Sequence, residues 1–357
     1  MPQDNFQEYE SPGCGDRKAP EGDERALAGR LVMAGLSGPE LDGTISRLIR
    51  EYGLSAFILF RRNISGRQQV EGLCSRLRAV CTDSAGREAL IAVDQEGGRV
   101  RRLLPPEFPD IPSNEQVGRQ DSPIDAARQQ AESAGRLLRG IGIDVNFAPV
   151  LDLALEASSY AAGGVLSQRC YSSSPHEAAR IGAAYIEALQ QEGVAAVAKH
   201  FPGIGRVQAD PHEDRPVVLA DEDTIVQEAL PFRAAVEAGV LGMMTSHVVY
   251  QGLDPAGPAT YSKIIAQGLL RDRFGFSGVL FSDDMEMGGI IGRDAIGEAC
   301  IRAIGCGHDM VLVCSRYDLL EEVLSAVSNA ISAGILPMSR VLEAAGRING
   351  LISSLRP

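Results

Sequence analysis

The sequence lacks the features that mark several common classes of protein. Its seven cysteines are an odd number, and no two of them are separated by only two residues. Neither a disulfide framework nor a thiolate zinc site is therefore expected. The sequence also has no basic excess, because its net charge is -13 at pH 7. A chain with this charge is a poor partner for nucleic acid or an anionic membrane, whose phosphates attract lysine and arginine.

Long apolar segments are missing as well. Residues 1–24 contain no apolar core of a signal peptide, and the sequence has no run of about 18 apolar residues. We therefore expect a reduced, cytoplasmic protein without a membrane span. Residues 1–24 are polar, contain several glycines and prolines, and show no hydrophobic periodicity. We expect them to form a disordered tail.

From residue 25 onward a short apolar run, a polar turn and an amphipathic segment follow one another repeatedly. The apolar runs predict eight strands, at residues 31–34, 56–60, 89–93, 145–150, 194–198, 241–246, 278–282 and 309–313. Continuous rather than alternating apolar residues are typical of strands buried on both faces of a parallel sheet. Eight strand–helix units predict an α/β protein, a (β/α)8 TIM-type barrel formed by residues 25–357 as a single domain. No glycine-rich phosphate fingerprint follows the first strand, which disfavours a Rossmann fold.

Ionisable residues collect where the predicted strands end. In a (β/α)8 barrel these ends meet at one face, where active sites are found. Carboxylates with a Lys–His pair, and no Cys/His ligand cluster, suit covalent chemistry on an uncharged polyol. The residues expected to converge are Asp94, Asp152, Lys199, His200, His247 and Asp283.

A glycine- and proline-rich stretch follows the fifth predicted strand and carries a second histidine, His212. Histidine shuttles protons readily near neutral pH, because its unperturbed pKa is about 6.5. Asp210 lies two residues before it and could orient the imidazole. Residues 210–214 also offer carboxylate and imidazole ligands, so a metal-dependent hydrolase is an alternative interpretation.

Five motifs, taken in order, resemble those of glycoside hydrolase family 3, and of its single-domain β-N-acetylglucosaminidases in particular. The resemblance runs from about residue 28 to the eighth predicted strand. The motifs are Val93–Val100 (VDQEGGRV), Asn146–Asp152 (NFAPVLD), Lys199–Gly203 (KHFPG), Asp210–His212 (DPH) and Phe281–Met285 (FSDDM).

This resemblance implies a retaining exo-β-N-acetylglucosaminidase that needs no metal or cofactor and whose partner is a carbohydrate. By the same resemblance, Asp283 is the nucleophile, preferred to its neighbour Asp284. His212 is the general acid/base, and Asp210 supports it. The residues expected to bind the sugar are Asp94, Arg169, Lys199, His200 and His247. Because the sequence has no tryptophan, tyrosine or phenylalanine must supply any aromatic surface in the sugar site.

The sequence departs from the family pattern in the loop around the proposed acid/base. Ile204 stands between two glycines where histidine is usual, Arg206 replaces an acid, and Pro211 replaces a serine. These changes affect the expected substrate more than the reaction type. Three alternatives follow: a transferase or phosphorylase, a specialised-pathway glycosidase with an altered substrate, and a sugar-binding barrel without turnover. The sequence carries no signal for the oligomeric state.

Overall fold

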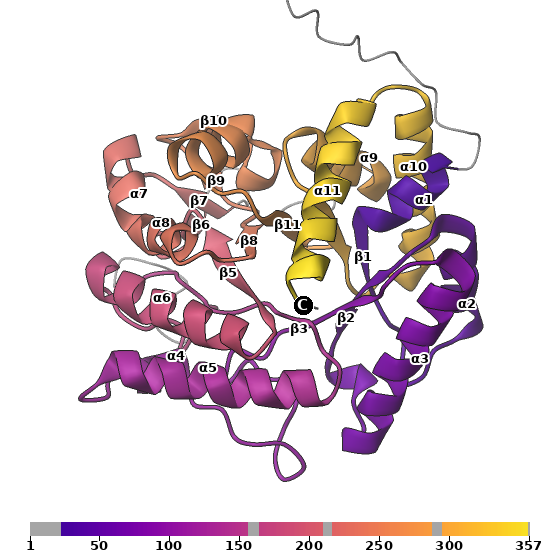
Figure 1. Cartoon of the computed structure of the whole chain (residues 1–357). Helices are drawn as coiled ribbons and strands as arrows, with labels where there is room; N and C mark the ends of the chain where they lie inside the picture. Colours follow the sequence, from indigo (N-terminus) through magenta and orange to yellow (C-terminus); the bar gives the residue numbers. More distant parts are fainter. Residues whose placement is uncertain (1–22, 156–163, 210–215, 288–294, 356–357) are drawn as a thin grey trace, which may run out of the picture.

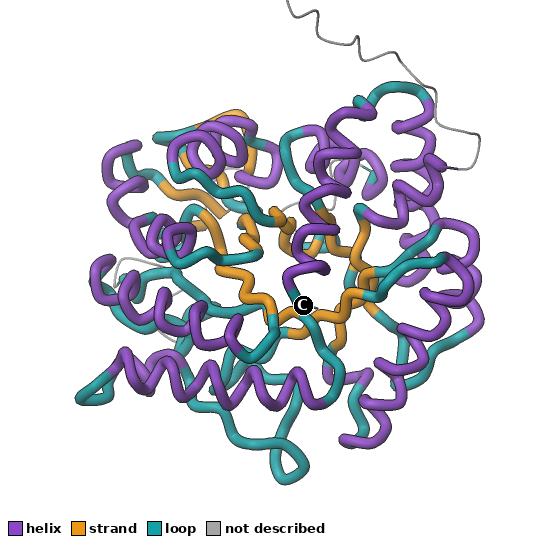
Figure 2. The backbone as a smooth tube through the Cα atoms, in the orientation of Figure 1, coloured by secondary structure: helices purple, strands orange, loops and turns teal. Residues whose placement is uncertain are grey.

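A closed barrel of eight parallel strands forms the centre of the computed structural model, which describes residues 23–155, 164–209, 216–287 and 295–355 (Figure 1). Figure 2 shows the strands gathered at the centre and the helices packed around them. The strands, in order around the barrel, are β1 (Val32–Gly35), β2 (Ala56–Leu59), β3 (Leu90–Val93), β4 (Val145–Asn146), β5 (Ala195–Phe201), β8 (Gly242–Thr245), β11 (Val279–Asp284) and β12 (Met310–Val313).

The predicted barrel is confirmed, and each of the eight predicted strands overlaps one barrel strand. Every residue of β1, β2 and β3 is buried, as expected for strands covered on both faces. The largest differences from the predicted boundaries are in β4 and β5. β4 is only two residues long, and β5 continues beyond Ala198 to Phe201. Lys199 and His200 therefore belong to a barrel strand, and their backbone is fixed by its pairing.

Amphipathic helices cover the barrel. α6 shows why they form where they do: Ser174 accepts a hydrogen bond from the Glu177 backbone N–H, and Pro175 occupies the first turn. The helices are α1 (Asp23–Arg30), α2 (Gly43–Tyr52), α3 (Arg67–Ala85), α4 (Asn114–Gly118), α5 (Pro123–Gly140), α6 (Pro175–Gln191), α7 (Glu222–Glu228), α8 (Leu230–Glu237), α9 (Ile296–Gly305), α10 (Tyr317–Ser332) and α11 (Met338–Ser354), with the short 3-10 helices η1 (Arg61–Asn63) and η2 (Ala259–Tyr261) and the π-helix η3 (Ile264–Arg273).

The N-terminal tail was predicted to extend to residue 24, but α1 begins at Asp23. Its first turn is too polar to carry a hydrophobic period, which is why the sequence placed the boundary later. Residues 1–22 lie outside the described residues. In the part of the chain that the structure describes, none of the helices combines the length and apolar character required to cross a membrane. The single-domain organisation of residues 25–357 remains a prediction.

A second sheet, which the sequence did not predict, lies beside the barrel. Its strands are β6 (Gln208–Ala209), β7 (Pro216–Val218), β9 (Val249–Tyr250) and β10 (Asp254–Pro258), in the order β10-β9-β7-β6. β6 pairs with β7 in antiparallel fashion, with Ala209 opposite Pro216. The chain on either side of residues 210–215 is therefore held by strand pairing. Asp210 and His212 themselves lie outside the described residues.

Candidate active site

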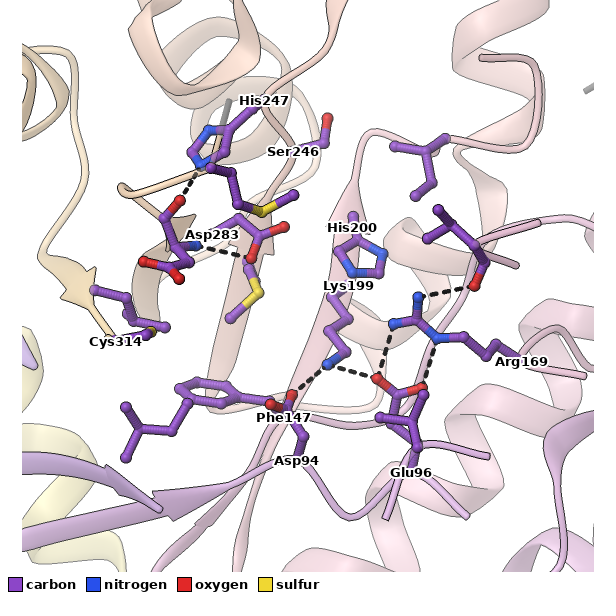
Figure 3. A pocket seen from close by; sticks show the side chains of 18 of the residues that line it. Asp94, Glu96, Phe147, Arg169, Lys199, His200, Ser246, His247, Asp283 and Cys314 are labelled. Carbon is purple, nitrogen blue, oxygen red and sulfur yellow. Dashed lines mark hydrogen bonds and ion pairs between the residues drawn. The ribbon is translucent and has the colours of Figure 1, made fainter. Parts of the chain in front are cut away.

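A pocket of about 350 Å³ lies at the carboxyl ends of the barrel strands. Eight residues were predicted to bind or transform the sugar, and Asp152 was also expected to converge with them. Of these nine, seven fall within the described chain, and all but Asp152 line this pocket (Figure 3). They come from four barrel strands or strand ends and from the segment between β4 and α6. These six are Asp94, Arg169, Lys199, His200, His247 and Asp283.

Oppositely charged side chains form a network of ion pairs on one side of the pocket. The Lys199 Nζ lies 2.7 Å from Asp94 Oδ1 and 2.7 Å from Glu96 Oε1. Arg169 donates two parallel hydrogen bonds to Glu96, each 2.8 Å long. Arg102 adds a longer contact of 3.2 Å to Asp94 Oδ2. Figure 3 shows this network facing Asp283 across the pocket. A sugar on this side would meet both cationic donors and a carboxylate acceptor.

The paired groups stay charged although they are buried. Burial alone would raise the pKa of Asp94, but Lys199 and Arg102 outweigh it and lower this pKa to about 2. Burial opposes the charged form of Lys199 in the same way, yet Asp94 and Glu96 raise its pKa above the ordinary lysine value. Neither group is therefore a proton shuttle at neutral pH. Their chemistry is hydrogen bonding with fixed charge.

His200 is oriented from behind by Asp152. The His200 Nδ1 lies 2.7 Å from Asp152 Oδ2, and the carboxylate also accepts the Ile204 backbone N–H at 2.9 Å. Asp152 is fully buried, so its interaction is with the protein and not with the pocket. Among the described residues none hydrogen-bonds His200 Nε2, and His200 lines the pocket.

His247 is held at both ring nitrogens. Its Nδ1 lies 2.6 Å from the Thr260 hydroxyl, and its Nε2 lies 2.9 Å from the Asp284 carbonyl oxygen. Because a carbonyl only accepts, Nε2 carries the proton. Burial lowers the pKa of His247, which favours the neutral imidazole. This geometry suits a residue that fixes the end of β11 beside Asp283.

Asp283 and Asp284 end β11 and differ in environment. Asp283 Oδ1 accepts the Asp284 backbone N–H at 2.8 Å, which holds its carboxylate in place within the pocket. Burial raises the pKa of Asp284 to about 6, and the nearby charges of Glu286 and Asp283 act in the same direction. Asp284 therefore takes up a proton at a higher pH than an ordinary aspartate does.

Two of the three departures in the loop after β5 fall within the described residues. Ile204 is buried and lines the pocket, as the sequence suggested. Arg206 instead pairs with Glu228 at the end of α7, with Nε 2.7 and 2.8 Å from the two carboxylate oxygens. Pro211 lies outside the described residues. The aromatic side chains that line the pocket include Phe60 and Phe147, a choice that the sequence left open.

Glu96 and Arg102 were not predicted as site residues. Glu96 was visible in the VDQEGGRV motif, two residues after Asp94, but its importance depends on Arg169 and Lys199, which are distant in sequence. Asp152 was expected at the site and instead supports His200 from behind. None of the described residues forms a group of three or more His, Cys, Asp or Glu side chains suited to a metal ion.

A family model, the glycosyl hydrolase family 3 N-terminal domain, matches residues 28–351. The chain belongs to glycosyl hydrolase family 3. The predicted family and enzyme class, a glycoside hydrolase, are thereby confirmed. A beta-hexosaminidase of Thioalkalivibrio sulfidiphilus is 37% identical over 84% of this chain and 84% of its own length. A beta-hexosaminidase of Thiobacillus denitrificans is 36% identical over 82% of this chain and 80% of its own.

Solved structures agree with this family 3 assignment. A family 3 β-N-acetylglucosaminidase from Paenibacillus superposes with a TM-score of 0.87 at 33% identity, over 93% of this chain. This chain spans 62% of that longer protein. NagZ from Neisseria gonorrhoeae, in complex with N-trifluoroacetyl-D-glucosamine, superposes with a TM-score of 0.74 at 30% identity. That match covers 90% of this chain and 98% of NagZ.

Proposed function

We propose that this protein is a retaining exo-β-N-acetylglucosaminidase that hydrolyses terminal β-linked N-acetylglucosamine. The proposal rests on the arrangement of two kinds of group on opposite sides of the pocket. Asp283, a fixed carboxylate, faces a network of Asp94, Lys199, Glu96 and Arg169 that is suited to sugar hydroxyls. Relatives named beta-hexosaminidase, and a related structure that holds an N-acylated glucosamine, support the choice of substrate.

In the first step a carboxylate oxygen of Asp283 bonds to the anomeric carbon, and the bond from that carbon to the aglycone oxygen breaks. His212 donates a proton to the departing oxygen, so the aglycone leaves as an alcohol. In the second step His212 removes a proton from water, which attacks the anomeric carbon. The Asp283 carboxylate is then released. Two inversions at one carbon retain the configuration. The roles of His212 and Asp210 rest on the sequence motif alone.

The network opposite Asp283 would hold the sugar during both steps. Lys199 and Arg169 would donate to sugar oxygens, and Asp94 would accept from a hydroxyl. His200 would offer Nε2, because its Nδ1 is engaged by Asp152. For His247 we propose a positioning role, since both of its ring nitrogens already have protein partners.

The test is a panel of aryl β-glycosides that differ only at C2, as acetamido, amino or hydroxyl. We expect turnover of the acetamido compound with retention of configuration, and none from Asp283→Ala. Preference for another C2 group would reassign the substrate. Faster turnover with added phosphate would indicate a phosphorylase, and no turnover of any compound would favour a sugar-binding barrel. The cytoplasmic location remains a prediction, which cell fractionation tests.

A further inference from the structure

The mouth of the pocket carries apolar side chains that are exposed to solvent. Val165 and Met287 line the pocket, and each is 47% exposed. Apolar groups that are grouped and exposed at one place often mark a binding surface. Among the described residues, the strongly exposed large apolar side chains are Val165, Leu219, Ile264, Met287, Ile335 and Leu342, so two of these six occur at a single pocket.

The backbones of Val165 and Met287 form hydrogen bonds with Arg169 and Asp284, two of the polar residues that line the pocket. The Val165 carbonyl accepts a hydrogen bond from Arg169 Nη1 at 3.1 Å, on the side of the sugar-binding network. The Met287 backbone N–H donates to the Asp284 carbonyl at 3.0 Å, on the side of the nucleophile. Their positions are therefore coupled to those of the residues that would hold the reacting sugar.

Buried side chains continue this apolar surface along the pocket wall. Ile204 and Val248 line the pocket and are 5% and 3% exposed. The Ile204 backbone is anchored by its hydrogen bond to Asp152, behind His200. Ile204 is also the position at which the sequence departs from the family pattern, where a polar histidine is usual. The departure therefore adds apolar area to the pocket.

We propose that this apolar mouth, formed by Val165, Ile204, Val248 and Met287, is the aglycone subsite and that it takes an alkyl or aryl group in preference to a second sugar. The inference rests on the proposed function, because it assigns the leaving-group side of the same reaction. Among the described residues that line the pocket, the polar side chains of Glu96, Lys199, His200 and His247 are buried, and one sugar ring would be bound beside them. A second sugar at Val165, Ile204 and Met287 would lose water from its hydroxyls without regaining equivalent partners from these side chains.

The test uses alkyl β-N-acetylglucosaminides from methyl to octyl, whose leaving groups differ in apolar area but hardly in acidity. We expect kcat/KM to rise by about two- to fourfold for each methylene that is buried, until the mouth is filled. A β-linked N-acetylglucosamine disaccharide is expected to fall below the hexyl compound. Varying chain length at constant acidity separates binding of the aglycone from its departure.

The variants Val165→Ser, Met287→Ser and the double variant should flatten the rise of kcat/KM with chain length. Ile335→Ser is the matched control, because Ile335 is exposed to 68% in the connection between α10 and α11. It should keep the wild-type dependence. Circular dichroism and thermal unfolding would confirm that each variant is folded.

A wild-type enzyme that cleaves all alkyl compounds at equal kcat/KM would overturn the aglycone inference and leave the proposed function intact. A folded double variant with the wild-type dependence on chain length would do the same. If no N-acetylglucosaminide in the series is cleaved, the proposed function fails and the aglycone inference fails with it.

Discussion

Glu96 satisfies two cations with one carboxylate, since Arg169 binds both of its oxygens and Lys199 shares one of them. It is buried, with 2% of its surface exposed, so it does not itself reach far into the pocket. We therefore regard it as a positioning residue. Its charge holds Lys199 and Arg169 where a sugar hydroxyl can meet them.

The substitution Glu96→Gln should raise KM and lower kcat/KM by about 100-fold, because a small displacement of positioning groups has a large effect on rate. It should also lower the free energy of unfolding by about 3–5 kcal/mol, since two buried cations lose a counter-ion. Steady-state kinetics and denaturant unfolding measure the two effects. Glu132→Gln is the control, because Glu132 is in an exposed pair on α5 that is worth less than about 1 kcal/mol. Wild-type kinetics in Glu96→Gln would contradict the positioning role.

Asp284 gives a prediction about pH. Its pKa is near 3.9 in an unfolded chain and about 6 in the fold, so the folded protein prefers the neutral carboxyl. Its contribution to stability is therefore full below about pH 4 and is lost as the pH rises through 6. Relative to Asp284→Asn, the wild type should lose roughly 1–3 kcal/mol of unfolding free energy between these limits. Thermal unfolding of both proteins across this range measures the difference. A difference that does not change with pH would argue against a raised pKa.

At the residue scale, strand-end position was enough to predict Asp94, Lys199, His200, His247 and Asp283, because a parallel barrel brings these ends together. It was not enough to give their partners. Whether Asp152 faces the pocket or supports His200 from behind depends on side-chain direction. A sequence does not show that direction where the strand is short or ends irregularly.

At the scale of elements, the small sheet connects the loop after β5 with the loop after β8. Tyr250 in β9 is the link: its hydroxyl donates to the Gly203 carbonyl at 3.0 Å and lies 2.9 Å from Ser246 Oγ. Gly203 follows the end of β5 and begins the chain that leads through β6 to residues 210–215. The position of this chain therefore depends on a contact with another strand connection.

Tyr250→Phe should lower the free energy of unfolding by about 1–2 kcal/mol, because Gly203 loses a buried donor. It should reduce kcat/KM more for glycosides with poor leaving groups, which need the proton that we assign to His212. Tyr185→Phe, which removes a buried hydroxyl bonded to Asn146, is the matched control for stability. If Tyr250→Phe lowers kcat/KM equally for good and poor leaving groups, the small sheet does not influence proton transfer.

The small sheet was missed because its strands have two to five residues and no alternating pattern. The barrel strands were found because burial on both faces leaves continuous apolar runs in the sequence. The extension of β5 was missed for a related reason. Lys199 and His200 break the apolar run but remain in the strand, since Asp94, Glu96 and Asp152 satisfy their charge and hydrogen bonds.

At the scale of the whole molecule, the two ends of the barrel have different tasks. Asp309 precedes β12, at the end opposite the pocket, and is fully buried. Arg271 contacts one of its oxygens at 2.7 Å, while Arg340 and Arg347 contact the other. Its Oδ2 also accepts the Leu280 backbone N–H at 2.9 Å. This carboxylate therefore joins η3 and α11 to two barrel strands.

Asp309→Asn should lower the free energy of unfolding by about 3–5 kcal/mol, because it removes the counter-ion of the buried Arg271. Below the unfolding temperature kcat/KM should stay within about twofold of the wild type, because the pocket lies at the opposite end of the barrel from Asp309. Denaturant unfolding and kinetics on the same preparation test the separation. A large loss of kcat/KM in folded protein would mean that the two ends are coupled.

The central claim is that Asp283 forms a covalent bond with the sugar, and trapping that intermediate tests it most directly. A fluorinated N-acetylglucosaminyl fluoride that reacts quickly and hydrolyses slowly would be added to the enzyme, followed by intact-mass measurement and peptide sequencing. We predict one added sugar per chain, located on Asp283 and absent from Asp283→Ala. A sugar located on Asp284 would contradict the account. So would an enzyme of unchanged mass that releases a product of inverted configuration.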